Sequence, residues 1–330
     1  GDPPVPQAPA ARGVWLTRRC PIPGHIAADG CSERDFAFQR GRGPKSRIDL
    51  VHEAAPFPIM FDAGHQVFPM QRSRGRARVA MAATGLLDLA QSGSARAILP
   101  RVTAGLPEIV FLNTSGGLAS GDDLSFAVDL RPGSRALATT QTAERAYRAE
   151  GPPAEARVAL SVGEGGWLDW LPQETILFDG ARLNRVTQVD LAPGAGCMLL
   201  ETVILGRLAM GETLRRLHLR DRRIVRRQGR LLHHDTLALD DAALTRRDHA
   251  AMLDGARAMA SLAIVADHAP DLLHSARAVL DEPGVTAAAS APPGRLVLRL
   301  LAADGWPLRR QIIRLLAVLR PAPLPRTWQI

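Results

Sequence analysis

The stretch from Ile109 to Leu130 reads IVFLNTSGGLASGDDLSFAVDL, and it decides the fold prediction. Its first four residues are apolar, as in a buried strand, and residues 124–130 resume with mostly alternating polarity, as in a second strand. Between them Gly116, Gly117 and Gly121 break regular structure, because glycine reaches backbone conformations that other residues avoid. The stretch therefore predicts a strand, a glycine loop that ends in two aspartates, and another strand.

A glycine loop after a strand can also cradle a phosphate, so a nucleotide site was weighed against a wide β turn. The chain has no Gly-x-x-x-x-Gly-Lys-[Ser/Thr] sequence, and its only lysine is Lys45. The loop leads into β-branched and aromatic residues rather than a helix, although a phosphate loop needs the helix. Asp122 and Asp123 at its exit would also repel phosphate. These observations favour the wide turn.

Short strand candidates recur on both sides of this loop, and turns rich in proline and glycine separate many of them. They fall at residues 72–78, 86–90, 97–99, 109–112, 124–130, 135–141, 156–162, 167–170, 185–191 and 197–204, and the pattern continues through 213–239. After Leu239 the pattern changes to a short helix or turn at 240–244, a strand at 259–266, a helix from Pro270 to about 283, strands at 285–289 and 295–301, and a helix at 308–319. The sequence thus predicts a mainly β fold of stacked sheets with a C-terminal β-α-β-β-α portion.

Residues 1–68 are predicted to be a disordered or loosely attached N-terminal extension, and residues 69–330 the folded domain. Ten of the 25 prolines fall within residues 1–69, and the apolar residues there follow neither strand nor helix periodicity. The absence of a signal-peptide pattern and of a long apolar run predicts a cytoplasmic protein without a membrane anchor. The three cysteines are too scattered for a disulfide framework, and Cys197 is expected to be buried.

The formal net charge of +8 raises the question of nucleic acid binding. Aromatic residues make up only 4% of the chain, too few for a base-stacking platform, and all basic residues except Lys45 are arginine. An acidic protein partner explains the charge equally well. Eight arginines lie between Arg215 and Arg230, which leaves two readings open: two solvated strand faces or a docking surface.

No catalytic signature was found: the chain lacks a Gly-x-Ser-x-Gly elbow, a His-Glu-x-x-His pair, a Cys-x-x-Cys pair and a dinucleotide fingerprint. The densest group of metal-ligand residue types is His233-His234-Asp235. Neighbouring strand residues point to opposite faces, so the two histidines are poorly placed to share one metal. A surface strand end is favoured there over a nickel contact.

Several motifs in register resemble the family of the urease accessory protein UreD, called UreH in some bacteria. They are Leu112 to Leu118, Gly121-Asp122, Thr139-Thr140-Gln141 with Glu144 to Tyr147, Trp167 to Phe178, Glu201 to Arg207, and Gly211-Glu212. The residues taken to be structural within these motifs are Gly116, Gly117, Gly121, Thr140, Gln141, Tyr147, Pro172 and Arg207. The resemblance covers roughly residues 70–320.

The resemblance implies a β-rich, β-helix-like fold and a non-enzymatic factor that matures nickel urease. It implies a scaffold that bridges the urease apoprotein to UreF and to the GTPase UreG, as a dimer of heteromeric complexes. It further implies transient nickel with no tightly bound cofactor, and neither a nucleic acid nor a membrane partner. The alternative is an unrelated metal-binding or enzymatic β domain.

Four acidic residues within the motifs are candidates for a nickel passage: Asp122, Glu174, Glu201 and Glu212. A carboxylate in an apolar strand, such as Glu201, is costly to bury unless it is paired, hydrogen-bonded or hydrated. Two readings stay open, a structural ion pair with Arg185 or Arg207, and a hydrated acidic path. Oxygen ligands hold nickel weakly, which suits transfer.

Overall fold

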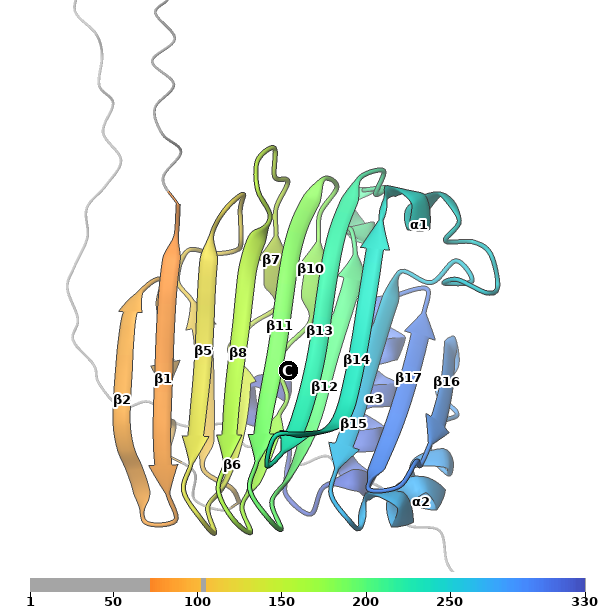
Figure 1. The fold of residues 1–330 in the computed structure, drawn as a ribbon. Helices are drawn as coiled ribbons and strands as arrows, with labels where there is room; N and C mark the ends of the chain where they lie inside the picture. The colour runs from red at the N-terminus through yellow and green to blue at the C-terminus, as the bar shows by residue number, and fades with distance from the viewer. Residues whose placement is uncertain (1–71, 102–104, 330) are drawn as a thin grey trace, which may run out of the picture. The chain divides into compact units, whose positions relative to one another are not determined.

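The computed structural model describes residues 72–101 and 105–329, and these form two stacked β sheets with a few helices (Figure 1). In spatial order, the strands of the seven-stranded sheet are β14 (Arg230–Asp240), β13 (Leu217–Arg227), β11 (Ala181–Leu191), β8 (Ala154–Val162), β5 (Asp123–Leu130), β1 (Arg74–Ala82) and β2 (Gly85–Gly93). Those of the ten-stranded sheet are β16 (Val285–Ser290), β17 (Arg295–Ala302), β15 (Ala258–Val265), β12 (Gly196–Leu205), β9 (Trp167–Trp170), β6 (Arg135–Thr140), β4 (Glu108–Asn113) and β3 (Ala95–Ile98), with β7 (Glu144–Ala146) and β10 (Thr175–Leu177) off this path.

The chain alternates between the sheets, so that each coil adds one strand to each. β4, β6, β9 and β12 lie in the ten-stranded sheet, and β5, β8, β11 and β13 lie in the other. Within each set, neighbouring strands are parallel. This winding confirms the predicted mainly β, β-helix-like stack, and the strand–loop–strand unit around the three glycines is β4, loop and β5.

Burial follows from which strand faces are covered. β5 alternates buried and half-buried residues because only one of its faces meets the other sheet. Nearly every residue of β12 is buried, and every residue of β15, because helices cover the second face of the ten-stranded sheet. One hydrophobic core therefore lies between the sheets, and a second lies between the ten-stranded sheet and the helices.

The C-terminal portion matches the predicted β-α-β-β-α order. It contains α1 (Asp241–Thr245), β15, η2 (Ala269–Leu272) with α2 (Leu273–Arg277), β16, β17, α3 (Gly305–Leu319) and η3 (Arg326–Trp328). The helix expected from Pro270 to about 283 is shorter, because residues 278–284 form turns. In α3 one apolar stripe is buried against the ten-stranded sheet, at Leu308, Ile312, Leu315, Leu316 and Leu319. No helix of the described chain is long and apolar enough to cross a membrane.

In two consecutive coils the strand of the ten-stranded sheet breaks off and resumes after a few residues. The segments between the two parts belong to the motifs. β6 ends at Thr140 and the coil resumes as β7, while β9 ends at Trp170 and resumes as β10. Pro172 has no N–H to donate to a ladder, which explains the end of β9. Beyond the interruption, Leu118 bridges Ala146, and Leu177 pairs with Leu205. The predicted extension, residues 1–68, lies outside the described residues.

Candidate functional site

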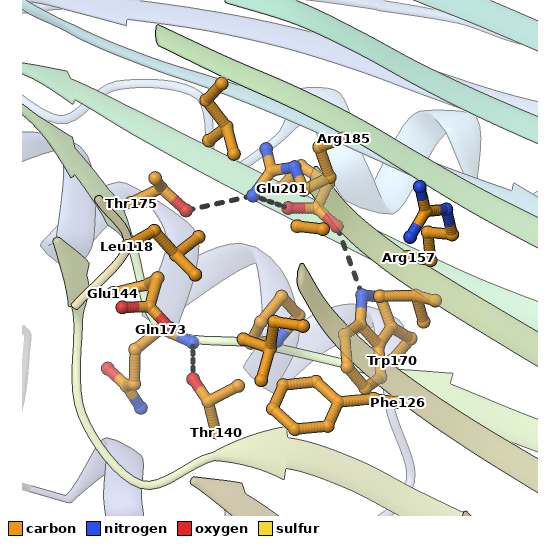
Figure 2. A pocket seen from close by; sticks show the side chains of 15 residues that line it. Leu118, Phe126, Thr140, Glu144, Arg157, Trp170, Gln173, Thr175, Arg185 and Glu201 are labelled. Carbon is orange, nitrogen blue, oxygen red and sulfur yellow. Dashed lines mark hydrogen bonds and ion pairs between the residues drawn. The ribbon is translucent and has the colours of Figure 1, made fainter. Parts of the chain in front are cut away.

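A small cavity lies between the two sheets at this interruption (Figure 2). Its volume is about 50 Å³, which is enough for a small number of water molecules. The apolar part of its wall includes Leu118, Leu124, Phe126, Val158, Trp170 and Leu183, and the polar part Thr140, Glu144, Gln173, Thr175, Arg185 and Glu201. Polar groups gather in one place of an otherwise apolar core.

Glu201 projects into the cavity because β12 has lost its β9 neighbour at this position. The β9–β12 pairing ends at Leu199, and β10 joins β12 only at Val203. One carboxylate oxygen of Glu201 accepts a hydrogen bond from the Trp170 indole at 3.1 Å, and the other lies 2.8 Å from an Arg185 nitrogen. Burial raises the pKa of Glu201 and the charge of Arg185 opposes this effect, so this carboxyl takes up a proton more readily than a carboxyl in water does.

Arg185 joins Glu201 to a second carboxylate, Asp221 on β13. The guanidinium donates two hydrogen bonds to Asp221, at 3.1 and 2.7 Å, and a third to the Thr175 hydroxyl at 2.9 Å. Burial opposes ionisation of Asp221, but the charge and hydrogen bonds of Arg185 outweigh it and lower the pKa of this carboxyl. Asp221 is therefore the counter-ion of Arg185. Of the two carboxyls, Glu201 is the one for which ionisation is less favourable.

The ion pairs continue from Asp221 toward the edge of the seven-stranded sheet. Arg223 lies 3.8 Å from Asp221 and 3.1 Å from Asp235, and Asp235 also contacts Arg299 and Ser261. The side chain of Arg299 is half exposed. We call this alternation the charge chain; it comprises Glu201, Arg185, Asp221, Arg223, Asp235 and Arg299.

Glu144 is a cavity carboxyl that the search for acidic candidates missed. It follows the Thr140-Gln141 turn, and its side chain lies beside the Asn113 amide at 3.3 Å. Burial raises its pKa. The available signal was its place within the motif that runs from Thr139 to Tyr147.

The other predicted acids lie in different surroundings. Both oxygens of Asp122 accept backbone N–H groups, from Ser73 at 2.7 Å and Ala119 at 2.8 Å, so this side chain holds the glycine loop. Glu174 lies in the turn before β10, not within an apolar strand as expected, and it lies 3.4 Å from Arg309 of α3. Neither residue lines the cavity.

Glu212 is clamped by Arg207, one of the two partners considered for Glu201. Arg207 donates through its side chain at 3.0 and 3.2 Å, and Glu212 also accepts the backbone N–H of Asp179. The hydrogen bonds from Arg207 lower the pKa of Glu212. Of the two candidate partners of Glu201, the structure therefore selects Arg185, because β12 ends between Glu201 and Arg207 and Arg207 lies exposed beyond the strand.

The remaining motif residues stack against one another at the sheet end. The Tyr147 hydroxyl donates to the Gly116 carbonyl at 2.9 Å, and its ring meets Phe178 edge-on with centroids 5.1 Å apart. The Arg207 guanidinium lies 4.2 Å above the Phe178 ring. Thr140 accepts the Gln173 N–H at 2.9 Å, while Pro172 is buried and Gln141 is exposed. The motifs, distant in sequence, form one continuous structure.

The expected surface strand end in β14 was wrong. His233 and Asp235 are buried between the sheets, whereas a surface strand end was favoured; only His234 is exposed. Of the eight arginines from Arg215 to Arg230, Arg223 alone is buried, and the other seven are exposed or half-buried. The reason is strand phase: these buried side chains share the inward phase of their strands with Leu219, Val225 and Leu239. Along the charge chain, charged side chains therefore occupy inward-facing positions that apolar side chains occupy elsewhere on these strands.

No group of three or more metal-ligand side chains occurs within residues 72–101 and 105–329. Cys197 is buried as expected, and burial raises the pKa of its thiol to about 12, so it is not available as a thiolate ligand. Two carboxyls, Glu144 and Glu201, and two guanidinium groups, Arg157 and Arg185, line this small cavity, and the carboxyls are the groups that can take up a proton or a cation.

Two facing sheets wound from alternate strands define a β-solenoid-like scaffold. A model of the UreD urease accessory protein family matches residues 73–329. The urease accessory protein UreD of Paracoccus denitrificans is 73% identical over 271 residues, which cover 82% of this chain and 97% of that relative. The UreD proteins of Cereibacter sphaeroides and a Methylobacterium species are 59% and 44% identical, covering 79% and 78% of this chain and 96% and 95% of the relatives. The chain belongs to the UreD family of urease accessory proteins.

Proposed function

We propose that this chain is a non-enzymatic scaffold of urease maturation that bridges the urease apoprotein to UreF and UreG and gives nickel an internal station on its way to urease. The observation that carries the proposal is the cavity between the sheets, which holds Glu144, Glu201 and Arg185 among motif loops. The relatives are named urease accessory proteins, and this supports a role in urease maturation.

The chemistry of the cavity suits a cation that stays briefly. Glu201 is buried and Glu144 is half-buried, and desolvation raises the pKa of both carboxyls, so a cation that binds either one must compete with its proton. Oxygen ligands bind nickel less tightly than imidazole or thiolate, which allows release. The proposed station therefore consists of Glu201 and Glu144. Glu174, Asp122 and Glu212 remain predicted members of the path, although the last two already serve hydrogen bonds of the fold.

Reconstitution with purified components tests the proposal. Urease apoprotein, UreF, UreG with GTP, and nickel are combined with and without this chain, and the nickel content and activity of urease are measured. We expect loading to depend on this chain, and we expect it to copurify with UreF and with urease. Equal nickel content in its absence, or no association with any component, would refute the scaffold role.

A further inference from the structure

One turn of the molecule exposes apolar side chains beside the stacked motif residues. η1 (Leu208–Met210) connects β12 to β13, and none of its residues is buried. Leu208 is 51% exposed and Met210 is 74% exposed, the highest value among the large apolar side chains of the described residues. Side chains left in water give up the free energy that their burial would provide, so their apolar character does not stabilise the fold.

The backbone of this turn is held firmly. Arg207 and Glu212 close it with side-chain hydrogen bonds at 3.0 and 3.2 Å, and the Arg257 guanidinium donates to the Glu212 carbonyl at 2.8 Å. Gly211 ends η1 with a left-handed conformation, φ 66°. The apolar side chains are thus presented on a rigid support, which lowers the entropy cost of binding a partner.

Exposed arginines lie near the two ends of the apolar turn and on the motif segments beside it. Arg145, Arg148, Arg207, Arg215 and Arg216 are exposed at this end of the sheets, and only Arg207 forms an ion pair within the described part of the chain. Asp179, the nearby carboxylate, is occupied by the backbone N–H groups of Arg215 and Arg216 at 2.6 and 3.0 Å. An apolar centre with a charged rim is the usual anatomy of a protein interface, and arginine is enriched there.

We propose that Leu208 and Met210 insert into an apolar groove with a carboxylate rim on a protein partner of urease maturation. The inference rests on the proposed function. The arginine rim argues for an acidic partner and against a second copy of this chain, because two identical rims would repel each other. The turn follows Leu205, which pairs with Leu177 of β10, and β10 begins at the cavity residue Thr175. A partner held here is therefore attached to the segments that line the cavity.

Paired serine substitutions test the surface. The variant Leu208→Ser/Met210→Ser is compared with Leu86→Ser/Leu87→Ser on β2, where the side chains are 49% and 53% exposed. Affinities for purified UreF, UreG and urease apoprotein are measured separately by biolayer interferometry, with thermal unfolding as the folding check. We expect the η1 variant to lose about tenfold or more in affinity for one partner, and the β2 variant to bind as the wild type does.

A charge-reversal variant, Arg215→Glu/Arg216→Glu, tests the rim. Only the backbone of these residues serves the fold, so the variant should unfold as the wild type does. We expect slower association with the same partner and a loss of the salt dependence seen for the wild type.

Unchanged affinity of the η1 variant for every partner that the wild type binds would overturn the inference and leave the proposed function intact. Equal losses in both serine variants would also overturn it, since the effect would not belong to this turn. A wild-type dimer in light scattering that Leu208→Ser/Met210→Ser converts to a monomer would identify a self-interface instead. A wild-type protein that binds none of the three partners would refute the proposed function and this surface with it.

Discussion

At the scale of single residues, Glu201 and Asp221 share one guanidinium on unequal terms. Asp221 receives two hydrogen bonds from Arg185, and its pKa is lowered. Glu201 meets Arg185 through one oxygen, and burial raises its pKa. Arg185 therefore keeps its doubly bonded counter-ion when Glu201 loses its charge, and keeps only the single contact with Glu201 when Asp221 does. This difference allows a test of whether Glu201 is a structural ion-pair partner or a member of a path for nickel.

Glu201→Gln is expected to fold and to load less nickel. The amide keeps the size of the side chain, its one oxygen can accept from Trp170 or from Arg185 but not from both, and Asp221 still balances Arg185. We expect a loss of about 1 kcal/mol or less in the free energy of unfolding, as for one hydrogen bond. The nickel content of urease matured with the variant should fall further than the amount of folded protein. Loading reduced only in proportion to lost protein would mean that Glu201 serves the fold.

Asp221→Asn provides the structural contrast. It leaves the Arg185 charge without its bidentate partner in a buried place, and breaking a buried pair in this way costs about 3–5 kcal/mol. Denaturant unfolding of both variants measures the difference. If Asp221→Asn unfolds no more easily than Glu201→Gln, then Arg185 is balanced by some other group.

His233 should make stability depend on pH below neutrality. Burial, with three nearby arginines, lowers its pKa from an ordinary 6.5 to about 4 in the folded protein. Between these values the unfolded chain binds a proton that the folded chain does not, so this stability is present above pH 6.5 and is lost as the pH falls toward 4, by up to about 3 kcal/mol.

Unfolding of His233→Gln and of the control His234→Gln across this pH range tests that contribution. His234 is exposed on the opposite face of the same strand. We expect the slope of stability against pH between 6.5 and 4 to flatten in His233→Gln and to persist in His234→Gln. The same slope in both variants would mean that groups other than His233 cause the loss of stability at low pH.

At the scale of elements, the interruption of the ten-stranded sheet depends on close packing of the glycine loop. A Cβ atom on Gly117 would lie 2.3 Å from a Tyr147 ring carbon and 2.8 Å from the Arg145 carbonyl oxygen. A Cβ on Gly116 would meet nothing within 4 Å, although φ is 78° there. Both glycines have a positive φ, 157° at Gly117 and 78° at Gly116, and only Gly117 adds a steric conflict with its neighbours.

Gly117→Ala should destabilise by about 2–3 kcal/mol, because the Tyr147 ring must leave its place against Phe178. Gly116→Ala should cost about 1 kcal/mol, for a left-handed backbone alone. Thermal unfolding gives both values, and the fluorescence of Tyr147, the only tyrosine, reports on the ring. Equal costs for the two variants would show that the ring moves aside freely.

At the scale of the whole molecule, residues 1–68 are predicted to be dispensable. The family match begins at residue 73, and the described strands complete two hydrophobic cores among themselves. A chain that begins at residue 69 should unfold within about 2 °C of the full chain, which corresponds to less than 1 kcal/mol. It should also mature urease to the same nickel content. Insoluble truncated protein would refute the prediction.

The sequence by itself determined the strand content, the helices of the C-terminal portion and the family. These follow from local patterns: alternating polarity, turns rich in proline and glycine, and the apolar stripe of residues 308–319. It also marked Glu201 as unusual, since one carboxylate in an apolar strand is visible without coordinates. Which arginine would balance it was left open between Arg185 and Arg207.

Only the tertiary structure decided that choice and the composition of the cavity. Arg185, Glu201 and Asp221 lie on three strands: the parallel register of β11 and β13 places Arg185 beside Asp221, and Glu201 reaches Arg185 from β12 of the other sheet. Glu144 was hidden in a polar loop, and His233 was assigned to the surface, because the sequence gives the two faces of a strand but not which one turns inward. The physical reason is that burial depends on what the neighbouring coils cover, and this is fixed by packing across residues far apart in the chain.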